Sequence, residues 1–237
     1  MPEEVYQFSN GIRVRRSDLL ESQIARYGAA GNPNLHEPVE EQWILRVMER
    51  AGSTSPAFLD IGAGIGYYAA LVKKRWPAAR VFAVEALPRH AAAIGETMKL
   101  NDIDPAGLTI LQAAIGARNG KAAFTDDGYG SRLAGLFGRK NAIDVETRRL
   151  DDVLKQTGHI DVMKMDIQGG ELTVLKSARK SLRAGMIGQM VVGTHGQKIH
   201  AALRHYLADV NYDILFDDGA PLMQPDGLIV AGISPAV

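Results

Sequence analysis

A glycine-rich turn between an apolar segment and a helical pattern constrains the fold of this 237-residue chain more than any other feature. Residues 57–61 form an apolar run typical of a buried strand, the turn reads Gly62-Ala-Gly64-Ile-Gly66, and residues 66–75 show helical spacing. Glycines at such a place let the backbone turn tightly and let a ligand approach main-chain N–H groups at the start of a helix. A strand, a ligand-binding turn and a helix are therefore expected in succession.

The same alternation continues toward the C-terminus. The further expected elements are, in chain order, strand 80–84, helix 89–100, strand 108–112, strand 143–146, helix 150–154, strand 160–165, helix 170–178, strand 186–192, helix 197–207 and strands 212–216 and 228–231. A glycine-rich excursion over 116–138 is expected to hold a short hairpin and an irregular loop. This alternation predicts an α/β, Rossmann-like, doubly wound fold, in which a mostly parallel sheet is covered on both faces and binds ligands at the carboxyl ends of its strands.

The region before the first core strand holds weaker helical patterns. Residues 18–27 form one, and residues 37–50 form a second that ends before Gly52. A chain of this length fits one α/β domain better than two. Residues 1–52 are therefore expected to form an N-terminal helical extension, and residues 53–237 the ligand-binding core.

The amino-acid composition indicates which kind of partner the chain binds. Lys plus Arg and Asp plus Glu both number 27, so no global charge draws the chain to nucleic acid or to an anionic membrane. No stretch reaches the roughly 18 apolar residues that cross a bilayer, and the acidic N-terminus lacks an apolar targeting segment. Cysteine is absent, which excludes disulfides and thiolate chemistry and agrees with a reducing cytoplasm. These features predict a cytoplasmic protein with a small-molecule partner; they do not fix its oligomeric state.

An acidic residue precedes the glycine turn, and another ends the next strand. Asp60 would repel a pyrophosphate in the turn, whereas S-adenosylmethionine carries a sulfonium and an amino group that favour nearby negative charge. Glu85 stands where an acid accepts hydrogen bonds from ribose hydroxyls, in enzymes that use either cofactor. Ala113 and Ala114 either lie against the adenine or serve strand–helix packing. The residues expected to bind S-adenosylmethionine are Glu37, Asp60, Gly62, Ala63, Gly64, Gly66, Tyr67, Glu85, Ala86, Ala113, Ala114 and Asp166.

A second acidic segment follows the expected strand at 160–165. It reads Lys164-Met-Asp166-Ile-Gln168-Gly-Gly170-Glu171. Asp166 ends the strand and is expected to face the ligand in the central crevice. Glu171 opens the next helix, where a carboxylate either serves the site or simply suits the helix dipole.

Together these segments resemble the FkbM family of methyltransferases, in which an Asp-x-Gly-Ala-x-x-Gly loop precedes Leu-Asp-x-x-Leu and Lys-x-Asp-x-x-Gly-x-Glu segments. The corresponding residues here are 60–66, 150–154 and 164–171, and the resemblance runs from about His36 to the last strand. It implies a class I fold with a seven-stranded sheet, S-adenosylmethionine as cofactor, and O-methylation of acceptors such as sugars and polyketide-type natural products. Gly64 replaces a common asparagine, and Gln168 replaces a usual acid, which argues against a metal role at that position.

Methyl transfer to oxygen requires that the acceptor hydroxyl be aligned and its proton removed. His195, in Gly-Thr-His-Gly after an apolar strand, is the expected general base, with Asp166 as the second catalytic residue. Glu37 either folds over the amino end of the cofactor or caps a helix. The polar loop at 125–132 is expected either to grip the acceptor or to form a flexible turn; its candidate acceptor-binding residues are Tyr129, Ser131 and Arg132. No metal is predicted.

Two other functional classes stay open from the residues alone. A nucleotide-dependent oxidoreductase could use the same glycine loop. A non-catalytic protein could bind S-adenosylmethionine or use the fold as a scaffold. RNA methylation is disfavoured by the balanced charge and the lack of a basic run, so a small-molecule or glycan acceptor is expected.

Overall fold

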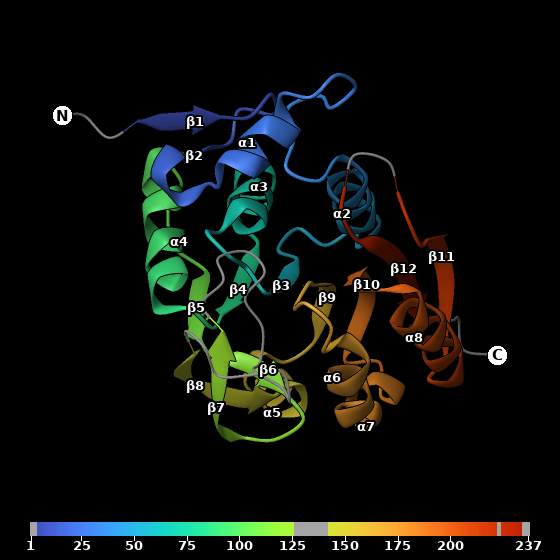
Figure 1. Cartoon of the computed structure of the whole chain (residues 1–237). Helices are drawn as coiled ribbons and strands as arrows, with labels where there is room; N and C mark the ends of the chain where they lie inside the picture. The colour runs from blue at the N-terminus through green and yellow to red at the C-terminus, as the bar shows by residue number, and fades with distance from the viewer. Residues whose placement is uncertain (1–3, 126–141, 222–223, 234–237) are drawn as a thin grey trace.

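The computed structural model describes residues 4–125, 142–221 and 224–233, and a seven-stranded sheet forms its centre (Figure 1). The strand order is β11-β12-β10-β9-β3-β4-β5. Each neighbouring pair from β10 to β5 is parallel, and β12 runs antiparallel to both β10 and β11. The strands are β3 (Ala57–Ile61), β4 (Arg80–Glu85), β5 (Leu108–Gln112), β9 (Ile160–Met165), β10 (Ile187–Thr194), β11 (Tyr212–Asp218) and β12 (Gly227–Ile233). The predicted α/β, mostly parallel fold is confirmed.

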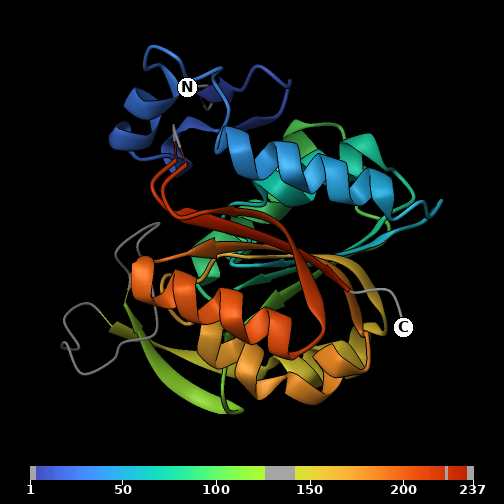
Figure 2. The same ribbon diagram turned by 90° about the vertical axis from the view of Figure 1, so that its right-hand side faces the viewer.

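Helices cover both faces of this sheet (Figure 2). The helices are α1 (Glu21–Tyr27), α2 (Pro38–Arg50), α3 (Tyr67–Arg75), α4 (Pro88–Leu100), α5 (Leu150–Thr157), α6 (Glu171–Ser177), α7 (Arg179–Arg183) and α8 (Gln197–Asp209). Side chains of α1 to α4 share one buried cluster with one face of the sheet, and those of α5 to α8 share another with the opposite face. Along β3, Phe58 enters the first cluster, and Leu59 and Ile61 enter the second, as the two-residue period of a strand requires.

The N-terminal segment packs on the first of these clusters. Strands β1 (Val5–Gln7) and β2 (Arg13–Arg15) form an antiparallel pair, followed by a short 3-10 helix, η1 (Arg16–Asp18). Phe8, Ile12 and Val14 are buried in the same cluster as the helices of the core. The sequence did not predict this strand pair, because its stability comes from contacts with distant residues.

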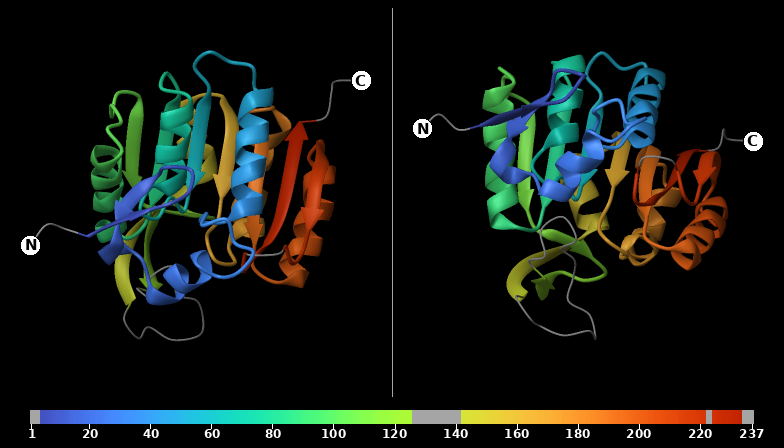
Figure 3. Two further views of the ribbon diagram at one scale, coloured as in Figure 1. Left: turned by 90° about the horizontal axis from the view of Figure 1, so that it is seen from above. Right: turned by 45° about the horizontal axis from the view of Figure 1, so that its top comes forward.

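A small second sheet lies next to α5 (Figure 3). It contains β6 (Ala114–Gly116), β7 (Gly120–Thr125) and β8 (Ala142–Arg149), in the order β6-β8-β7. A short hairpin was expected within residues 116–138. Strand β7 lies in that range, but it pairs antiparallel with β8, which begins only at Ala142. Among the described residues, no helix combines the length and apolar character needed to cross a membrane.

Candidate functional site

A cavity of about 270 Å³ opens where β3, β4 and β9 reach their carboxyl ends. Its wall contains most of the residues that the sequence assigned to a cofactor, namely Gly62, Ala63, Gly64, Tyr67, Glu85, Ala86, Ala113, Ala114 and Asp166. Other residues of the wall were not predicted, among them Phe8, Leu19, His36, Tyr68, His90, Phe124 and Lys164. The predicted positions converge because parallel strands bring their carboxyl ends to the same edge of a sheet.

The glycine turn has a backbone that only glycine adopts without strain. Gly62 has φ 78°, and Gly66, at the N-cap of α3, has φ 86°. A Cβ atom on Gly62 would overlap the carbonyl oxygen of Asp166, and one on Gly66 would lie 3.0 Å from Cγ2 of Ile94. Gly62 therefore permits the close approach of β3 and β9, whereas Gly66 packs against α4 and does not line the cavity.

Main-chain hydrogen bonds hold Glu85 in the cavity wall. Gly64 N donates to its Oε2 at 2.8 Å, and Leu87 N donates to its Oε1, also at 2.8 Å. Burial raises the pKa of Glu85, although these donors act in the opposite direction. The carboxylate is thus fixed at the end of β4, where the sequence predicted a contact with ribose, and His90 lies close by, with Nδ1 3.9 Å from Oε1.

Asp60 lies behind the glycine turn and not in the cavity wall. It is fully buried and is the register partner of Lys164 on β9, whose Nζ lies 3.8 Å from Oδ1. Neither carboxylate oxygen of Asp60 has a hydrogen-bond partner among the described residues. Burial raises the pKa of Asp60 to about 6, and the ammonium of Lys164 opposes this effect. Lys164 itself reaches the cavity and donates to the carbonyl oxygen of Gly62 at 3.3 Å.

Glu37 forms the N-cap of α2 and also lies outside the cavity wall. Its carboxylate is 3.8 Å from Nη1 of Arg26, and the residue is 7% exposed. Burial, together with the nearby carboxylates of Glu40 and Asp166, raises the pKa of Glu37 well above its usual value. The Glu37 side chain makes no capping hydrogen bond to α2, so the residue is a buried acid beside the site.

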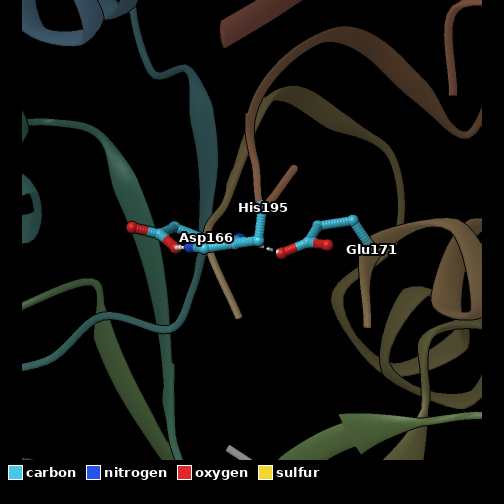
Figure 4. Close-up of side chains that lie close together, drawn as sticks. All are labelled: Asp166, Glu171 and His195. Atoms are coloured by element: carbon cyan, nitrogen blue, oxygen red, sulfur yellow. Dashed lines mark hydrogen bonds and ion pairs between the residues drawn. The ribbon is translucent and has the colours of Figure 1, made fainter. Parts of the chain in front are cut away.

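His195 is surrounded by three carboxylates, two of which are drawn with it in Figure 4. Its Nδ1 lies 2.8 Å from Oε1 of Glu171, the first residue of α6. Its Nε2 lies 3.4 Å from Oδ1 of Asp166 and 3.4 Å from Oδ1 of Asp226. Burial lowers the pKa of His195, but these carboxylates outweigh it and raise the pKa to about 10. In this arrangement His195 is an imidazolium at neutral pH.

Asp166 belongs to both the cavity wall and the His195 group. Burial raises its pKa, against the opposing charge of Lys164. Nε2 of Gln168 donates to Oδ1 of Asp166 at 3.4 Å, so the residue that replaces the usual acid contributes an amide donor. Asp166 therefore joins the cofactor cavity to the residues expected to handle the acceptor.

Among the residues that the structure describes, two sets of side chains have the spacing that a cation would require. Ligand atoms of Asp166, Glu171 and His195 lie within 4.8 Å of one another, as do those of Glu37, Asp166 and Asp226. Carboxylate oxygens suit magnesium or calcium, but an imidazolium has no free lone pair for a metal, which argues against a cation in the set that contains His195. The three-carboxylate set lies beside the cations Lys164 and Arg26. We assign none of these residues as a metal ligand.

Sequence reasoning missed several residues of the site. His36 is a cavity residue whose Nδ1 lies 2.6 Å from the hydroxyl of Tyr27, and burial lowers its pKa to about 3. Asp226 carries no local signal, since its place depends on the reversed direction of β12. Lys164 was not predicted as a site residue, although it begins the acidic segment 164–171 whose pattern the sequence shows. The predicted acceptor residues Tyr129, Ser131 and Arg132 lie outside the described residues.

Comparisons with known protein sequences give a family model and a relative. A family model described as the methyltransferase FkbM domain matches residues 60–214. Methyltransferase sdnD from Sordaria araneosa is 26% identical over 202 residues, which cover 69% of this chain and 76% of that protein.

Solved structures share the fold at low identity. A precorrin-6y C5,15-methyltransferase from Geobacter metallireducens has a TM-score of 0.50 at 16% identity, covering 80% of this chain and 87% of the other. The N-terminal domain of human METTL16, in complex with SAH, has a TM-score of 0.52 at 13% identity, covering 83% and 70%. At such identities the similarity shows the fold alone.

Proposed function

Because this chain belongs to the FkbM methyltransferase family, we propose that it transfers a methyl group from S-adenosylmethionine to a hydroxyl oxygen of a small-molecule, sugar or natural-product acceptor. Dependence on S-adenosylmethionine follows from the family. The oxygen atom and the class of acceptor are the proposed part. Family membership favours methyl transfer over the oxidoreductase that the glycine loop alone left open.

The residues of the cavity fit this cofactor. The glycine turn lines the cavity ahead of α3, and Glu85, which accepts a hydrogen bond from Gly64 N, offers a fixed carboxylate at the end of β4. Asp60 is an orphaned buried acid next to the turn, which favours a cationic guest. When bound, S-adenosylmethionine supplies an electrophilic methyl carbon. Glu85, Asp166 and the turn from Gly62 to Gly66 are the residues we expect to hold it.

The observation that best supports the proposal is that Asp166 belongs both to the cofactor cavity and to the group around His195. Its side chain lines the cofactor cavity, and its Oδ1 is also 3.4 Å from Nε2 of His195. A hydroxyl acceptor must lose a proton as its oxygen is methylated, and this pair lies at the border of the cavity. Glu171 fixes the imidazole through Nδ1, which leaves Nε2 directed toward Asp166.

We assign the removal of the proton to the Asp166–His195 pair. Because His195 is charged at neutral pH, the carboxylate of Asp166 accepts the proton. The imidazolium of His195 holds this carboxylate in place. At high pH a neutral His195 accepts the proton directly through Nε2. Both routes predict that loss of the imidazole impairs turnover without removing the cofactor site.

An acceptor screen with isotopically labelled methyl donor tests the proposal. Hydroxylated natural products, sugars and glycans are incubated with the protein, and the labelled atom of each product is identified by NMR. His195→Ala should retain cofactor binding and lose turnover, while His205→Ala, at an exposed position of α8, should change neither. Methylation only of nitrogen or carbon would overturn the assignment to oxygen, and unchanged turnover in His195→Ala would remove His195 from the mechanism.

A further inference from the structure

Acidic side chains gather around a single ammonium behind the cofactor cavity. Asp60 is fully buried, Glu40 is 1% exposed and Glu37 is 7% exposed. They come from β3 and from the start of α2, and they face Lys164 of β9, which is 4% exposed. Asp166 adds a fourth carboxylate at the end of the same strand, and its oxygen lies within 4.8 Å of that of Glu37. The negative groups outnumber the ammonium that they surround.

Cationic side chains on neighbouring elements do not neutralise the excess of carboxylates around Lys164. Arg26 of α1 lies 3.8 Å from Glu37, and His195 faces Asp166. Glu85 on β4 and Asp226 before β12 add further carboxylates, and both influence the charge of the group. Among the described residues, the fixed cations near the cavity therefore leave carboxylates without a counter-charge.

Burial makes such an excess costly, because an unpaired carboxylate loses its hydration and takes up a proton instead. Neither oxygen of Asp60 has a hydrogen-bond partner among the described residues. Burial raises the pKa of Asp60 to about 6, raises that of Glu37 well above its usual value, and raises that of Asp166. Lys164 remains an ammonium, since Glu40 and Asp60 outweigh the effect of its burial and raise its pKa. Below about pH 6 the free protein therefore carries a proton on Asp60 that a cation in the cavity would displace.

We propose that the buried carboxyl groups of Glu37, Asp60 and Asp166 distinguish S-adenosylmethionine from its product by charge. A sulfonium in the cavity ionises one of them and releases a proton to solvent, whereas the neutral thioether of S-adenosylhomocysteine leaves that proton in place. The charge of the donor then contributes to its affinity, and the product lacks that contribution. The inference rests on the cofactor and not on the proposed oxygen acceptor.

The reaction keeps this charge balance. As the carbon–sulfur bond breaks and the carbon–oxygen bond forms, the positive charge on sulfur disappears and the acceptor hydroxyl gives up its proton. One carboxylate of the group takes up one proton in place of the lost charge, with Asp166 as the member that reaches both the cavity and His195. The total charge within the cavity is therefore the same before and after transfer.

Isothermal titration calorimetry in pairs of buffers with different ionisation enthalpies counts the protons released on binding. The ligands are S-adenosylmethionine, sinefungin, which carries an amine in place of the sulfonium, and S-adenosylhomocysteine. Because the pKa of Asp60 is about 6, we expect the two charged ligands to release about half a proton more than the neutral one at pH 6 and close to one proton more at pH 5. Their relative affinity should rise by up to about tenfold per pH unit below pH 6. Equal proton counts for all three ligands would overturn the proposal.

Variants show which residue causes the difference in proton release. Asp60→Asn should reduce the difference in proton release between S-adenosylmethionine and S-adenosylhomocysteine, while Glu96→Gln should preserve it, because the side chain of Glu96 on α4 is 44% exposed and is paired with Lys99. If Asp60→Asn does not fold, the three-ligand comparison on the wild-type protein still decides. A protein that shows the proton difference but methylates no hydroxyl refutes the proposed acceptor atom and leaves the charge discrimination standing.

Discussion

Replacement of Asp226 by asparagine is expected to lower the pKa of His195. The wild-type pKa of about 10, against an ordinary value of 6.5, corresponds to a preference for the imidazolium of about 5 kcal/mol. Asp226 supplies one of two carboxylate oxygens at 3.4 Å from Nε2. Removal of an opposite charge at this distance should lower the pKa by about one to three pH units. The neutral fraction of His195 at pH 7.5 then rises by about tenfold for each unit.

NMR titration of the histidine ring protons between pH 6 and 11 measures this change directly. His195→Gln identifies the resonance, and Asp213→Asn, at an exposed position of β11, serves as the matched control. If His195 removes the acceptor proton, turnover of the wild type should rise with pH toward 10, and the alkaline rise of Asp226→Asn should move to lower pH by the same amount as the pKa.

Two results would refute the reasoning. A wild-type pKa of His195 below 7.5 would mean that the three carboxylates do not hold the imidazolium. A pKa that is equal in the wild type and in Asp226→Asn would mean that Asp226 does not contribute to the charge of His195.

Other variants test the fold and the site. Gly62→Ala should abolish cofactor binding in a calorimetric titration, since its Cβ would overlap the carbonyl oxygen of Asp166, whereas Gly95→Ala, with open space in α4, should stabilise the protein by about 0.5–1 kcal/mol. Phe58→Ala, at a fully buried position of β3, should lower the urea-derived free energy of unfolding by about 3–5 kcal/mol. The stabilisation due to His195, taken as the difference between wild type and His195→Gln, should be complete below about pH 6.5 and be lost as pH rises to about 10.

The core elements were the most predictable part of the fold. The bounds of β3, β5 and β9 agree with the expected ranges 57–61, 108–112 and 160–165. Each pairs with parallel neighbours, and β3 and β9 are buried almost throughout, so an apolar run marks them directly. The short helix α7 was missed because it begins two residues after α6 ends, so the sequence there shows one continuous helical pattern.

The sequence predicted those residues of the site that lie at the carboxyl ends of parallel strands. Glu85 and Asp166 fall at the cavity because each ends or directly follows a strand whose carboxyl end lies at that edge. Asp60 was expected to touch the cofactor, but the two-residue period of β3 turns its side chain into the layer that holds Lys164. The environment of His195 could not be foreseen, since the segment 164–171 and Asp226 lie far from His195 in the sequence and meet it only in the folded chain.

The reversed direction of β12 decides which part of the chain can reshape the surroundings of His195. A strand that runs with its neighbours presents its last residues at the active edge, whereas β12 presents the residues that lead into it, including Asp226. Insertions or deletions ahead of Gly227 would therefore alter the surroundings of His195. An engineer who wishes to change the accepted substrate while keeping the cofactor should vary the connection between β11 and β12.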